Sequence, residues 1–238
     1  FFVNNLNNTK SFYSRLKILN TMNLFAIIPA HNEGKNIGKV IDNVKAHTKN
    51  IIVVDDGSTD NTYNTAKEKG VILLNHIVNM GKGSAMKTGC EYAIKHDAKQ
   101  IIFIDADGQH DPSEIPSFLE ALKDVDIVFG YRRDYENIPF ILRFGNWFIN
   151  KSVKFLYNLD LKDTQNGYRA FNAGIYEKIK WRALDYSVES EIIANIGKNH
   201  LKYREIPIKT IYSSKYKGTT VIDGIKIVIN MILWKIGM

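Results

Sequence analysis

The feature that most constrains how this chain can fold is the regular alternation, over residues 24–129, of short apolar runs and longer segments with helical periodicity. The apolar runs predict strands near 24–29, 51–55, 71–74, 101–104 and 126–129, and the segments between them predict helices near 34–46, 60–69, 83–96 and 113–123. Strands and helices that alternate in this way form an α/β fold, in which helices cover both faces of a parallel sheet. The chain has 238 residues, and we expect one such domain over residues 22–215.

Both ends of the chain depart from this pattern. Residues 1–21 lack an initial Met and are rich in Asn and Lys, so we expect an N-terminal extension ahead of the domain. Residues 216–238 predict an amphipathic C-terminal helix that is too short and too interrupted to span a bilayer. This helix either lies at a membrane interface or packs on the protein's own core, and the aromatic, basic segment 138–159 allows the same two interpretations. One stripe of the C-terminal helix would carry Ile222, Ile225, Ile229, Ile232 and Leu233.

Composition limits the partners and the compartment. The net charge of +7, from 32 basic and 25 acidic residues, favours an anionic partner such as a nucleotide, a phospholipid surface or a nucleic acid. The basic residues form no recognised DNA- or RNA-binding motif, so we expect no nucleic acid. The sequence has no run of 18 or more apolar residues and no signal-peptide pattern, and its single Cys90 cannot form an internal disulfide. We therefore expect a cytoplasmic protein that is soluble or peripheral to a membrane.

Acidic pairs follow two of the predicted strands. Asp105 and Asp107 come directly after the run at 101–104, and Asp55 and Asp56 lie at the end of the run at 51–55. Ligands of open α/β sheets bind at the carboxyl ends of the strands, so both pairs stand where a binding site is expected. Asp105 and Asp107 suit a hard cation such as Mg²⁺ or Mn²⁺, although a polar turn with Gly108 at positive φ explains them equally well. Asp55 and Asp56 suit the N–H groups of a base or the hydroxyls of a ribose.

Two further loops carry polar groups near predicted strand ends. Pro29 is expected to end the first strand, and His31 and Glu33 follow it in the loop that enters a helix. The segment NMGKGSAMKTG at 79–89 is rich in glycine, but it has neither the Walker spacing nor the dinucleotide-binding spacing G-x-G-x-x-G. We interpret residues 81–83 as a tight turn that leaves Lys82 available for an anion.

Six segments, taken in order and spacing, resemble a known family. They are IIPAHNE, VVDDGSTD, GKGSAMKTG, DADGQHDP, GYRR and DTQNGYRAF, and the resemblance covers about residues 22–212. The chain resembles the family 2 glycosyltransferases of the GT-A fold, and within them the dolichyl- and polyprenyl-phosphate sugar transferases typified by dolichol-phosphate mannosyltransferase. The resemblance implies a Rossmann-like, mixed but mainly parallel sheet, a GDP- or UDP-sugar as donor, and Mg²⁺ or Mn²⁺ as cofactor.

The resemblance also implies roles for individual residues. The nucleotide pocket would contain Pro29, His31, Glu33, Asp55 and Asp56, with Ala106 near the ribose, although the family more often has Tyr where His31 stands. The metal would be held by Asp105, Asp107 and Gln109, and it would neutralise the diphosphate as it leaves. Arg132 of GYRR would bind phosphate oxygens through its guanidinium. The residues expected to act in catalysis are Asp107, Arg132 and Asp163, and Lys82 and Lys215 are expected to contact the anionic substrates.

The acceptor decides whether a general base is needed. The resemblance implies inversion by direct displacement onto a polyprenyl or dolichyl phosphate, which is already an anion at neutral pH and needs no base. The basic strip at 198–217 suits a lipid head group at a membrane surface, although a solvated protein face is the alternative. This branch usually has an arginine where Ser213 stands, and Lys215 or Lys217 would replace it. If the acceptor is instead a hydroxyl of a glycan or polysaccharide, the base would be Asp163, Glu189 or Glu191.

Two other protein classes compete with this interpretation. Phosphatases with an Asp nucleophile also place D-x-D after an apolar strand, but their motif lies near the start of the domain and has Thr or Val where Gln109 stands here. A non-catalytic membrane-surface module with a degenerate sugar-nucleotide fold would have a broken D-x-D, which is intact in this chain. We therefore predict a glycosyltransferase that works on the cytoplasmic face of a membrane.

Overall fold

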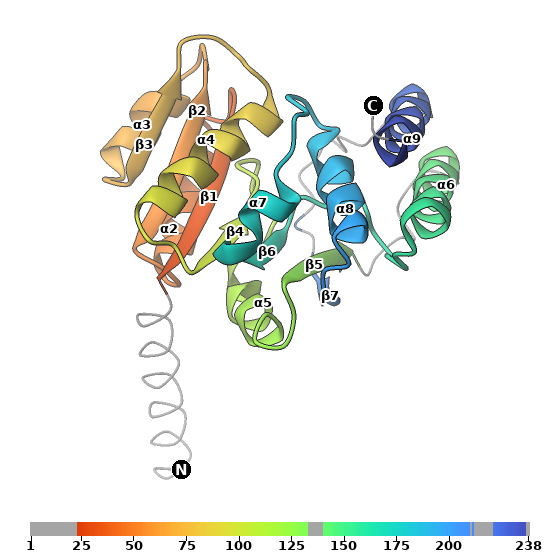
Figure 1. Ribbon diagram of the computed structural model, residues 1–238. Helices are drawn as coiled ribbons and strands as arrows, with labels where there is room; N and C mark the ends of the chain where they lie inside the picture. The colour runs from red at the N-terminus through yellow and green to blue at the C-terminus, as the bar shows by residue number, and fades with distance from the viewer. Residues whose placement is uncertain (1–22, 133–139, 210, 212–220, 237–238) are drawn as a thin grey trace, which may run out of the picture.

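The structure, a computed structural model, describes residues 23–132, 140–209, 211 and 221–236. Within these residues one seven-stranded sheet has the order β3-β2-β1-β4-β6-β5-β7 (Figure 1). β6 is antiparallel to its neighbours β4 and β5, and the other neighbouring strands are parallel. The strands are β1 Leu24–Ala30, β2 Asn50–Asp56, β3 Ile72–His76, β4 Gln100–Phe103, β5 Ile127–Arg132, β6 Arg169–Asn172 and β7 Tyr203–Ile208.

Helices cover both faces of this sheet (Figure 1). Successive side chains of a strand point to opposite faces, so Ile27 and Phe103 contribute to one core while Ile28 and Ile102 contribute to the other. The first core is closed by α4, α6, α7, α8 and α9, and the second by α2, α3 and α5. The helices are α2 Ile37–Lys45, α3 Thr62–Glu68, α4 Lys82–Lys95, α5 Ile115–Ala121, α6 Phe140–Tyr157, α7 Tyr176–Ile179, α8 Val188–Lys198 and α9 Val221–Lys235, with short 3₁₀ turns at Pro112–Glu114 and Ala173–Ile175.

The predicted α/β architecture is confirmed. The five predicted strands and four predicted helices are present, with bounds that differ by a few residues, and the helix expected at 113–123 is a 3₁₀ turn followed by α5. Strand β6 was not predicted, because it has four residues and begins with the charged side chain of Arg169. That antiparallel strand makes the sheet mixed and separates strands β1 to β4 from β5 and β7.

Pro29 does not end the first strand, contrary to expectation. β1 continues to Ala30, and Pro29 pairs in register with Val54 of β2. The carbonyl of Ile27 accepts from the N–H of Ile104, the residue after the neighbouring strand β4. Backbone groups of a strand alternate between its two neighbours, so the backbone N–H and C=O positions of residues 27 and 29 both point toward β4. β4 itself ends at Phe103, and the N–H that proline lacks would therefore face a side on which ladder pairing has already stopped.

The helices α6 and α9 pack side by side at one end of the molecule (Figure 1). Ile227 and Met231 of α9 are buried, and the hydroxyl of Tyr157 on α6 donates to the carbonyl of Met231 at 2.6 Å. The predicted apolar stripe is on the other side of α9, where Ile225, Ile229 and Ile232 are about half exposed; the side chain of Ile222 lies outside the described residues. Helix α9 is thus apolar on both its packed and its exposed side.

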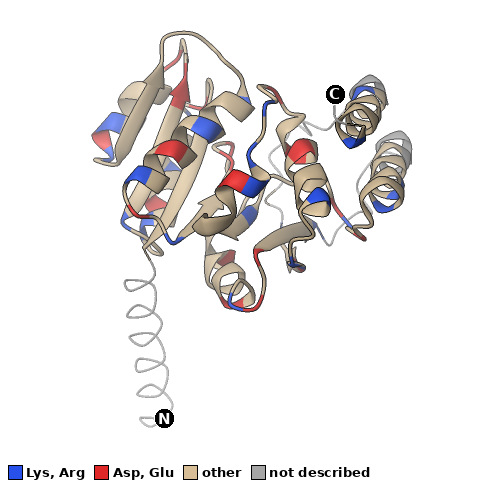
Figure 2. Ribbon diagram, in the orientation of Figure 1, with Lys and Arg blue, Asp and Glu red and all other residues tan. Residues whose placement is uncertain are grey.

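Each helix of this pair exposes apolar and basic side chains. Trp147 and Phe155 of α6 are exposed, as is Ile236 just after α9. Lysines are the charged residues among the described side chains of both helices, which Figure 2 shows as blue segments without red. No helix in the described part of the chain is long and apolar enough to cross a bilayer.

Candidate functional site

Polar side chains from three loops meet at the carboxyl edge of the sheet. β1 lies between β2 and β4 and is parallel to both, so the residues after all three strands reach the same edge. The loop after β1 carries His31 and Glu33, β2 ends in Asp55 and Asp56, and Asp105 to Asp107 follow β4. The structure therefore brings together the groups that the sequence placed at strand ends, at the position where open α/β sheets bind ligands.

The loops after β1 and β2 are tied to each other. His31 Nδ1 lies 2.8 Å from the carbonyl oxygen of Asp56, and the side-chain oxygen of Asn32 accepts from the N–H of Thr59 at 2.9 Å. The N–H of Glu33 donates to the hydroxyl of Thr62 at 2.8 Å. These bonds hold the exposed ring of His31 and the half-buried carboxylate of Glu33 at the edge of the sheet.

The two acids that end β2 have different surroundings. Asp56 accepts from the N–H groups of Met80 and Gly81 at 2.9 and 2.8 Å, and His76 Nδ1 lies 2.6 Å from it. Its carboxylate thus fixes the loop that leads into α4. Asp55 is equally buried, but within the described residues its Oδ1 has no hydrogen-bond partner. Asp55 is therefore the acid of this pair that retains an unused acceptor.

Glycine is required where these loops meet. Gly57 has a φ of 66°, and a Cβ at this position would lie 2.4 Å from the carbonyl carbon of Val78. Only a residue without a side chain allows the turn after β2 to approach the 78–81 loop this closely. That approach is what lets the Asp56 carboxylate reach the N–H groups of Met80 and Gly81.

Asp105 lies between Lys82 and His110, a histidine to which the sequence analysis assigned no role. Lys82 Nζ lies 2.8 Å from Asp105 Oδ1, and the backbone N–H of Asp105 donates to His110 Nδ1 at 3.1 Å. Burial would raise the pKa of Asp105, but Lys82, together with His110, lowers it to about 2. Burial lowers the pKa of His110 to about 4 against the opposing effect of Asp105. The ring, stacked on Tyr168 with centroids 4.7 Å apart, is therefore neutral at pH 7.

The pKa of Asp107 is shifted in the opposite direction from that of Asp105. Burial, and then the charges of Asp105 and Glu33, raise the pKa of the Asp107 carboxyl above its usual value. Its Oδ1 accepts from the backbone N–H of Gln109 at 3.0 Å. The protein supplies too little positive charge at this carboxylate, and a hard cation would correct that deficit.

The residues of this edge would supply only part of the ligands of a metal ion. Among the described residues, no three His, Cys, Asp or Glu side chains converge as a complete metal site. Mg²⁺ is usually bound through one or two carboxylates together with substrate phosphates, so an incomplete set is what such a site requires. Asp107 is buried next to Asp105, which raises the pKa of its carboxyl, and the N–H of Gln109 donates to it, whereas one oxygen of Asp105 is already paired with Lys82.

Lys82, which the sequence places where it could meet an anion, already contacts two carboxylates of the chain. Its Nζ lies 2.8 Å from Asp105 Oδ1 and 2.8 Å from Glu189 Oε1 in the first turn of α8. Burial by itself would lower the pKa of Lys82, but Asp105 and Glu189 raise it above its usual value. Residues 82 and 83 begin α4 and do not form the predicted tight turn, and the N–H of Gly83 donates to the carbonyl of Leu184 at 2.7 Å. The lysine therefore joins the carboxyl edge to α8.

Arg132 and Asp163 form a bidentate ion pair. Arg132 Nε and a terminal nitrogen donate to the two carboxylate oxygens at 2.7 and 2.9 Å, and Asp163 is buried. Glu191 is similarly occupied, because it accepts from the backbone N–H groups of Arg182 and Ala183. Glu189 pairs with Lys82, so all three acids considered as general bases hold donors of the chain itself.

Arg169 is a second residue that the sequence reading did not single out. It is fully buried at the start of β6, and its guanidinium donates to the carbonyls of Asn166 at 2.7 Å and Glu189 at 3.3 Å. The segment NGYRAF contains Arg169, but only the short strand β6 turns its side chain into the core. Lys215 and Lys217 lie outside the described residues, so the structure does not place them.

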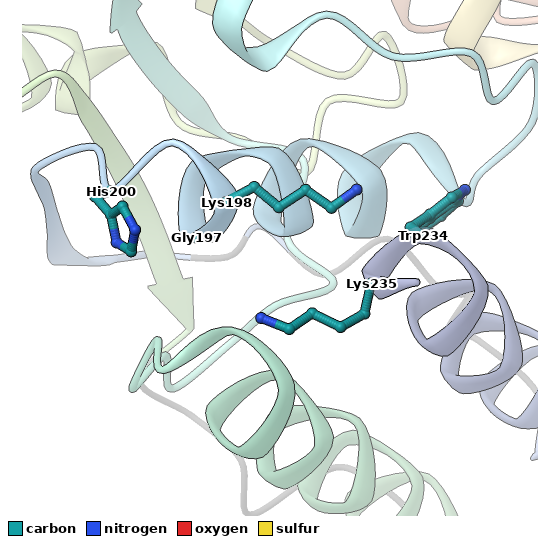
Figure 3. Close-up of a pocket in the computed structure, with 5 residues that line it drawn as sticks. All are labelled: Gly197, Lys198, His200, Trp234 and Lys235. Carbon is teal, nitrogen blue, oxygen red and sulfur yellow. The ribbon is translucent and has the colours of Figure 1, made fainter. Parts of the chain in front are cut away.

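A separate pocket of about 360 Å³ lies at the far end of α8 (Figure 3). It is lined by Gly197, Lys198, His200, Trp234 and Lys235. The α-helical rise of 1.5 Å per residue puts Lys198 roughly 13 Å along α8 from Glu189. This basic pocket is thus distinct from the carboxyl edge and lies between the C-terminal ends of α8 and α9.

Comparison with known proteins decides the family. Residues 25–180, which include the carboxyl-edge loops and the Arg132–Asp163 pair, match the family described as Glycosyl transferase family 2. The chain belongs to glycosyltransferase family 2. The enzyme therefore has the GT-A fold that its sheet order and helix layers display.

Several relatives resemble the enzyme over almost its whole length. The UDP-N-acetylglucosamine–dolichyl-phosphate N-acetylglucosaminyltransferase of Methanococcus voltae is 34% identical, over 90% of this chain and 96% of that protein. The undecaprenyl-phosphate mannosyltransferase of Micrococcus luteus is 27% identical, over 90% of this chain and 94% of that protein. Among solved structures, glucosyl-3-phosphoglycerate synthase from Mycobacterium tuberculosis, in complex with Mn²⁺, UDP and phosphoglyceric acid, superposes with a TM-score of 0.70 at 18% identity, over 90% of this chain and 78% of that one. This last likeness supports the fold.

Proposed function

We propose that the enzyme transfers a sugar from a GDP- or UDP-sugar to a polyprenyl or dolichyl phosphate. The nucleoside would lie at the carboxyl edge, in a pocket built from Pro29, His31, Glu33 and Asp55, with the buried Ala106 beside the ribose. The unpartnered oxygen of Asp55 supports this placement, because a base N–H or a ribose hydroxyl would satisfy it. Asp56 would act indirectly by holding the loop that carries Lys82.

A divalent cation, Mg²⁺ or Mn²⁺, would be held by Asp107 and Gln109 with a share of Asp105. When bound, it would neutralise negative charge on the donor's diphosphate. Arg132, oriented by Asp163, and Lys82, oriented by Asp105 and Glu189, would bind phosphoryl oxygens from the protein side. An acceptor phosphate oxygen would attack the anomeric carbon, and the bond to the nucleoside diphosphate would break with its electron pair on the leaving oxygen.

The observation that carries the choice of acceptor is the occupation of the candidate bases. Asp163 is bound by Arg132 and Glu191 by two backbone N–H groups, so neither is poised to take a proton from a hydroxyl. A phosphate acceptor needs no such base, because it is ionised at neutral pH. The relatives named above, which cover nearly the whole chain and are named for transfer to dolichyl or undecaprenyl phosphate, support the same acceptor class.

The membrane that contains such an acceptor would be met by the exposed side of α6 and α9. Trp147, Phe155 and Ile229 on that side would enter the interface, while Lys226 and Lys235 would contact anionic head groups. The enzyme would then be peripheral, on the cytoplasmic face, where nucleotide sugars are supplied.

The test is a transfer assay. Purified enzyme with Mn²⁺ or Mg²⁺ is incubated with polyprenyl phosphate and a panel of GDP- and UDP-sugars, and labelled lipid is extracted into organic solvent. We expect one donor to label the lipid phosphate. Transfer to a glycan hydroxyl in place of the lipid, with no labelled lipid from any donor, would reject the proposed acceptor and favour the polysaccharide alternative.

A further inference from the structure

Resting on the function just proposed, we infer that Glu189 is a positioning residue for Lys82. Glu189 fixes the lysine ammonium beside Asp105, so that its remaining N–H meets a phosphoryl oxygen of the substrates. Glu189 then does not have the role of a general base, which was considered for it in the case of a hydroxyl acceptor.

The two carboxylates that contact Lys82 come from separate elements of the fold. Lys82 is the first residue of α4, Asp105 follows β4, and Glu189 lies in the first turn of α8. The Nζ atom is 2.8 Å from Asp105 Oδ1 and 2.8 Å from Glu189 Oε1. With Asp105 alone the lysine would be held at one point, and the second carboxylate removes its freedom to turn about that contact.

The geometry leaves one donor of the ammonium unassigned. A lysine ammonium has three N–H donors, and the two carboxylates account for two of them. The side chain of Lys82 is 17% exposed and that of Asp105 is 26% exposed, whereas that of Glu189 is 6% exposed. The lysine and Asp105 thus reach the mouth of the site, while Glu189 supports them from behind.

The absence of a side chain at Gly167 leaves room for Lys82 and Asp105. A Cβ on Gly167 would lie 2.8 Å from Asp105 Oδ2 and 3.1 Å from Lys82 Nζ. Any side chain at position 167 would therefore displace the pair. The exposed ring of Tyr186 stands on another side, with its centroid 5.9 Å from Lys82 Nζ.

Glu189 is itself held in place by buried charge. Arg169, with no exposed surface, donates to the backbone carbonyl of Glu189, and Glu189 lies in the N-terminal turn of α8, where the helix dipole favours a negative charge. Lys82, Arg169, Asp105 and Glu189 together balance two positive with two negative charges.

Stability alone does not explain the buried network of Lys82, Asp105, Glu189 and Arg169. Removing charges from water costs free energy that ion pairing often fails to recover, and apolar residues of similar volume frequently stabilise a core better. Within the described residues, Glu189 Oε2 and Arg169 Nε are also buried without a hydrogen-bond partner. A network that leaves polar atoms unsatisfied is better explained by the position it gives to Lys82 at the mouth.

The phosphoryl oxygen that Lys82 meets has two sources, the donor's diphosphate and the acceptor's phosphate. Both offer an anionic oxygen to an N–H donor. Affinity for UDP or GDP with Mn²⁺, measured by calorimetry, reports the first, and the KM for a water-soluble farnesyl phosphate reports the second. The calorimetric arm requires no turnover, so it remains informative if lipid phosphate is not the acceptor.

The test is a double-mutant cycle with Lys82→Met, Glu189→Gln and the double variant. We expect Lys82→Met to weaken at least one of the two arms. Glu189→Gln should weaken the same arm and lower kcat by roughly 10- to 100-fold, because misplacing a substrate-contacting group by about 1 Å has effects of that size. In the Lys82→Met background, Glu189→Gln should have little further effect, since the residue through which it acts is already gone.

Two further variants separate positioning from folding. Glu189→Asp keeps the charge and should recover part of the activity lost in Glu189→Gln. Glu177→Gln makes the same chemical change at an exposed carboxylate that pairs only with Lys180 among the contacts described, and it should behave as the wild type. Melting temperatures of all variants are compared. An undiminished effect of Glu189→Gln in the Lys82→Met background, or unchanged values in both arms for Lys82→Met, would overturn the inference.

Discussion

At the scale of single residues, four aspartates that look alike in the sequence occupy four different environments. Asp56 accepts from two backbone N–H groups, Asp55 keeps an unpartnered oxygen, Asp105 is paired with Lys82, and burial next to Asp105 raises the pKa of Asp107. Spacing along the chain cannot distinguish these cases, because each depends on a partner from another element.

Asp107 is predicted to carry the metal dependence. Asp107→Asn should lower transfer by about 100-fold or more, since the metal contributes several kcal/mol of charge stabilisation, while the melting temperature stays close to that of the wild type. Initial rates over a Mn²⁺ titration check this. Undiminished turnover in Asp107→Asn, or full activity of the wild type in EDTA, would contradict the metal assignment.

Asp56 is predicted to act through stability. Asp56→Ala leaves the N–H groups of Met80 and Gly81 without their acceptor, so the free energy of unfolding should fall by about 2–4 kcal/mol. Urea unfolding measures the change. Asp42→Ala is the matched control, because Asp42 forms an exposed ion pair with Lys69, and its loss should cost less than about 1 kcal/mol. Equal effects of the two substitutions would argue against the role of Asp56 in the loop.

At the scale of elements, the decisive features are where α8 and α9 lie. The first turn of α8 brings Glu189 to Lys82, so a helix of the second half completes the edge formed by β1, β2 and β4. Helix α9 buries Ile227 and Met231 and leaves a row of isoleucines in solvent. An exposed apolar row beside lysines is typical of a surface that meets a membrane.

The exposed row of α9 is predicted to bind lipid. A double substitution, Ile229→Ser with Ile232→Ser, should reduce flotation with anionic vesicles by roughly 10-fold or more, because each buried isoleucine contributes about 1.5–3 kcal/mol before losses. These residues are 51% and 46% exposed, so the melting temperature should change little. Ile94→Ser on α4 is the control, with a side chain 37% exposed. Wild-type protein that stays in the soluble fraction would show that these isoleucines do not bind a membrane.

At the scale of the whole molecule, the two cores on either side of the sheet contain tyrosines that keep their protons to a higher pH in the folded protein than in the unfolded chain. Burial raises the pKa of Tyr157 to about 12, and it also raises the pKa values of Tyr168 and Tyr176. Between pH 10 and 12 the unfolded chain releases these protons while the folded protein keeps them. The equilibrium therefore moves toward the unfolded state as the pH rises.

We accordingly predict that the free energy of unfolding falls above pH 10, by about 1.4 kcal/mol per pH unit for each such tyrosine. Urea unfolding at pH 8, 10 and 11 measures this slope. Tyr157→Phe should lower the stability at pH 8 by about 1 kcal/mol, because the bond to Met231 is lost, and should reduce the alkaline slope. A slope that is the same in Tyr157→Phe would show that Tyr157 does not contribute.

The sequence by itself determined the α/β architecture and that the acids of the candidate site end at one edge of the sheet. Both follow from local information: Ile37, Val40, Ile41 and Val44 repeat at helical spacing, and Asp55 and Asp105 directly follow apolar strands. The carboxyl ends of parallel strands necessarily meet at one edge, so placing acids at strand ends is enough to locate the site.

Only the tertiary structure decided which charges pair and which apolar face is exposed. The antiparallel strand β6 turned Arg169 into the core, and α8 brought Glu189 to Lys82, more than a hundred positions away in the chain. The predicted stripe of α9 faces solvent, because its opposite side is also apolar and packs on α6 and α8. Ion pairing and helix packing depend on distances in space between segments that are remote in sequence, and periodicity along a single segment contains no information about those distances.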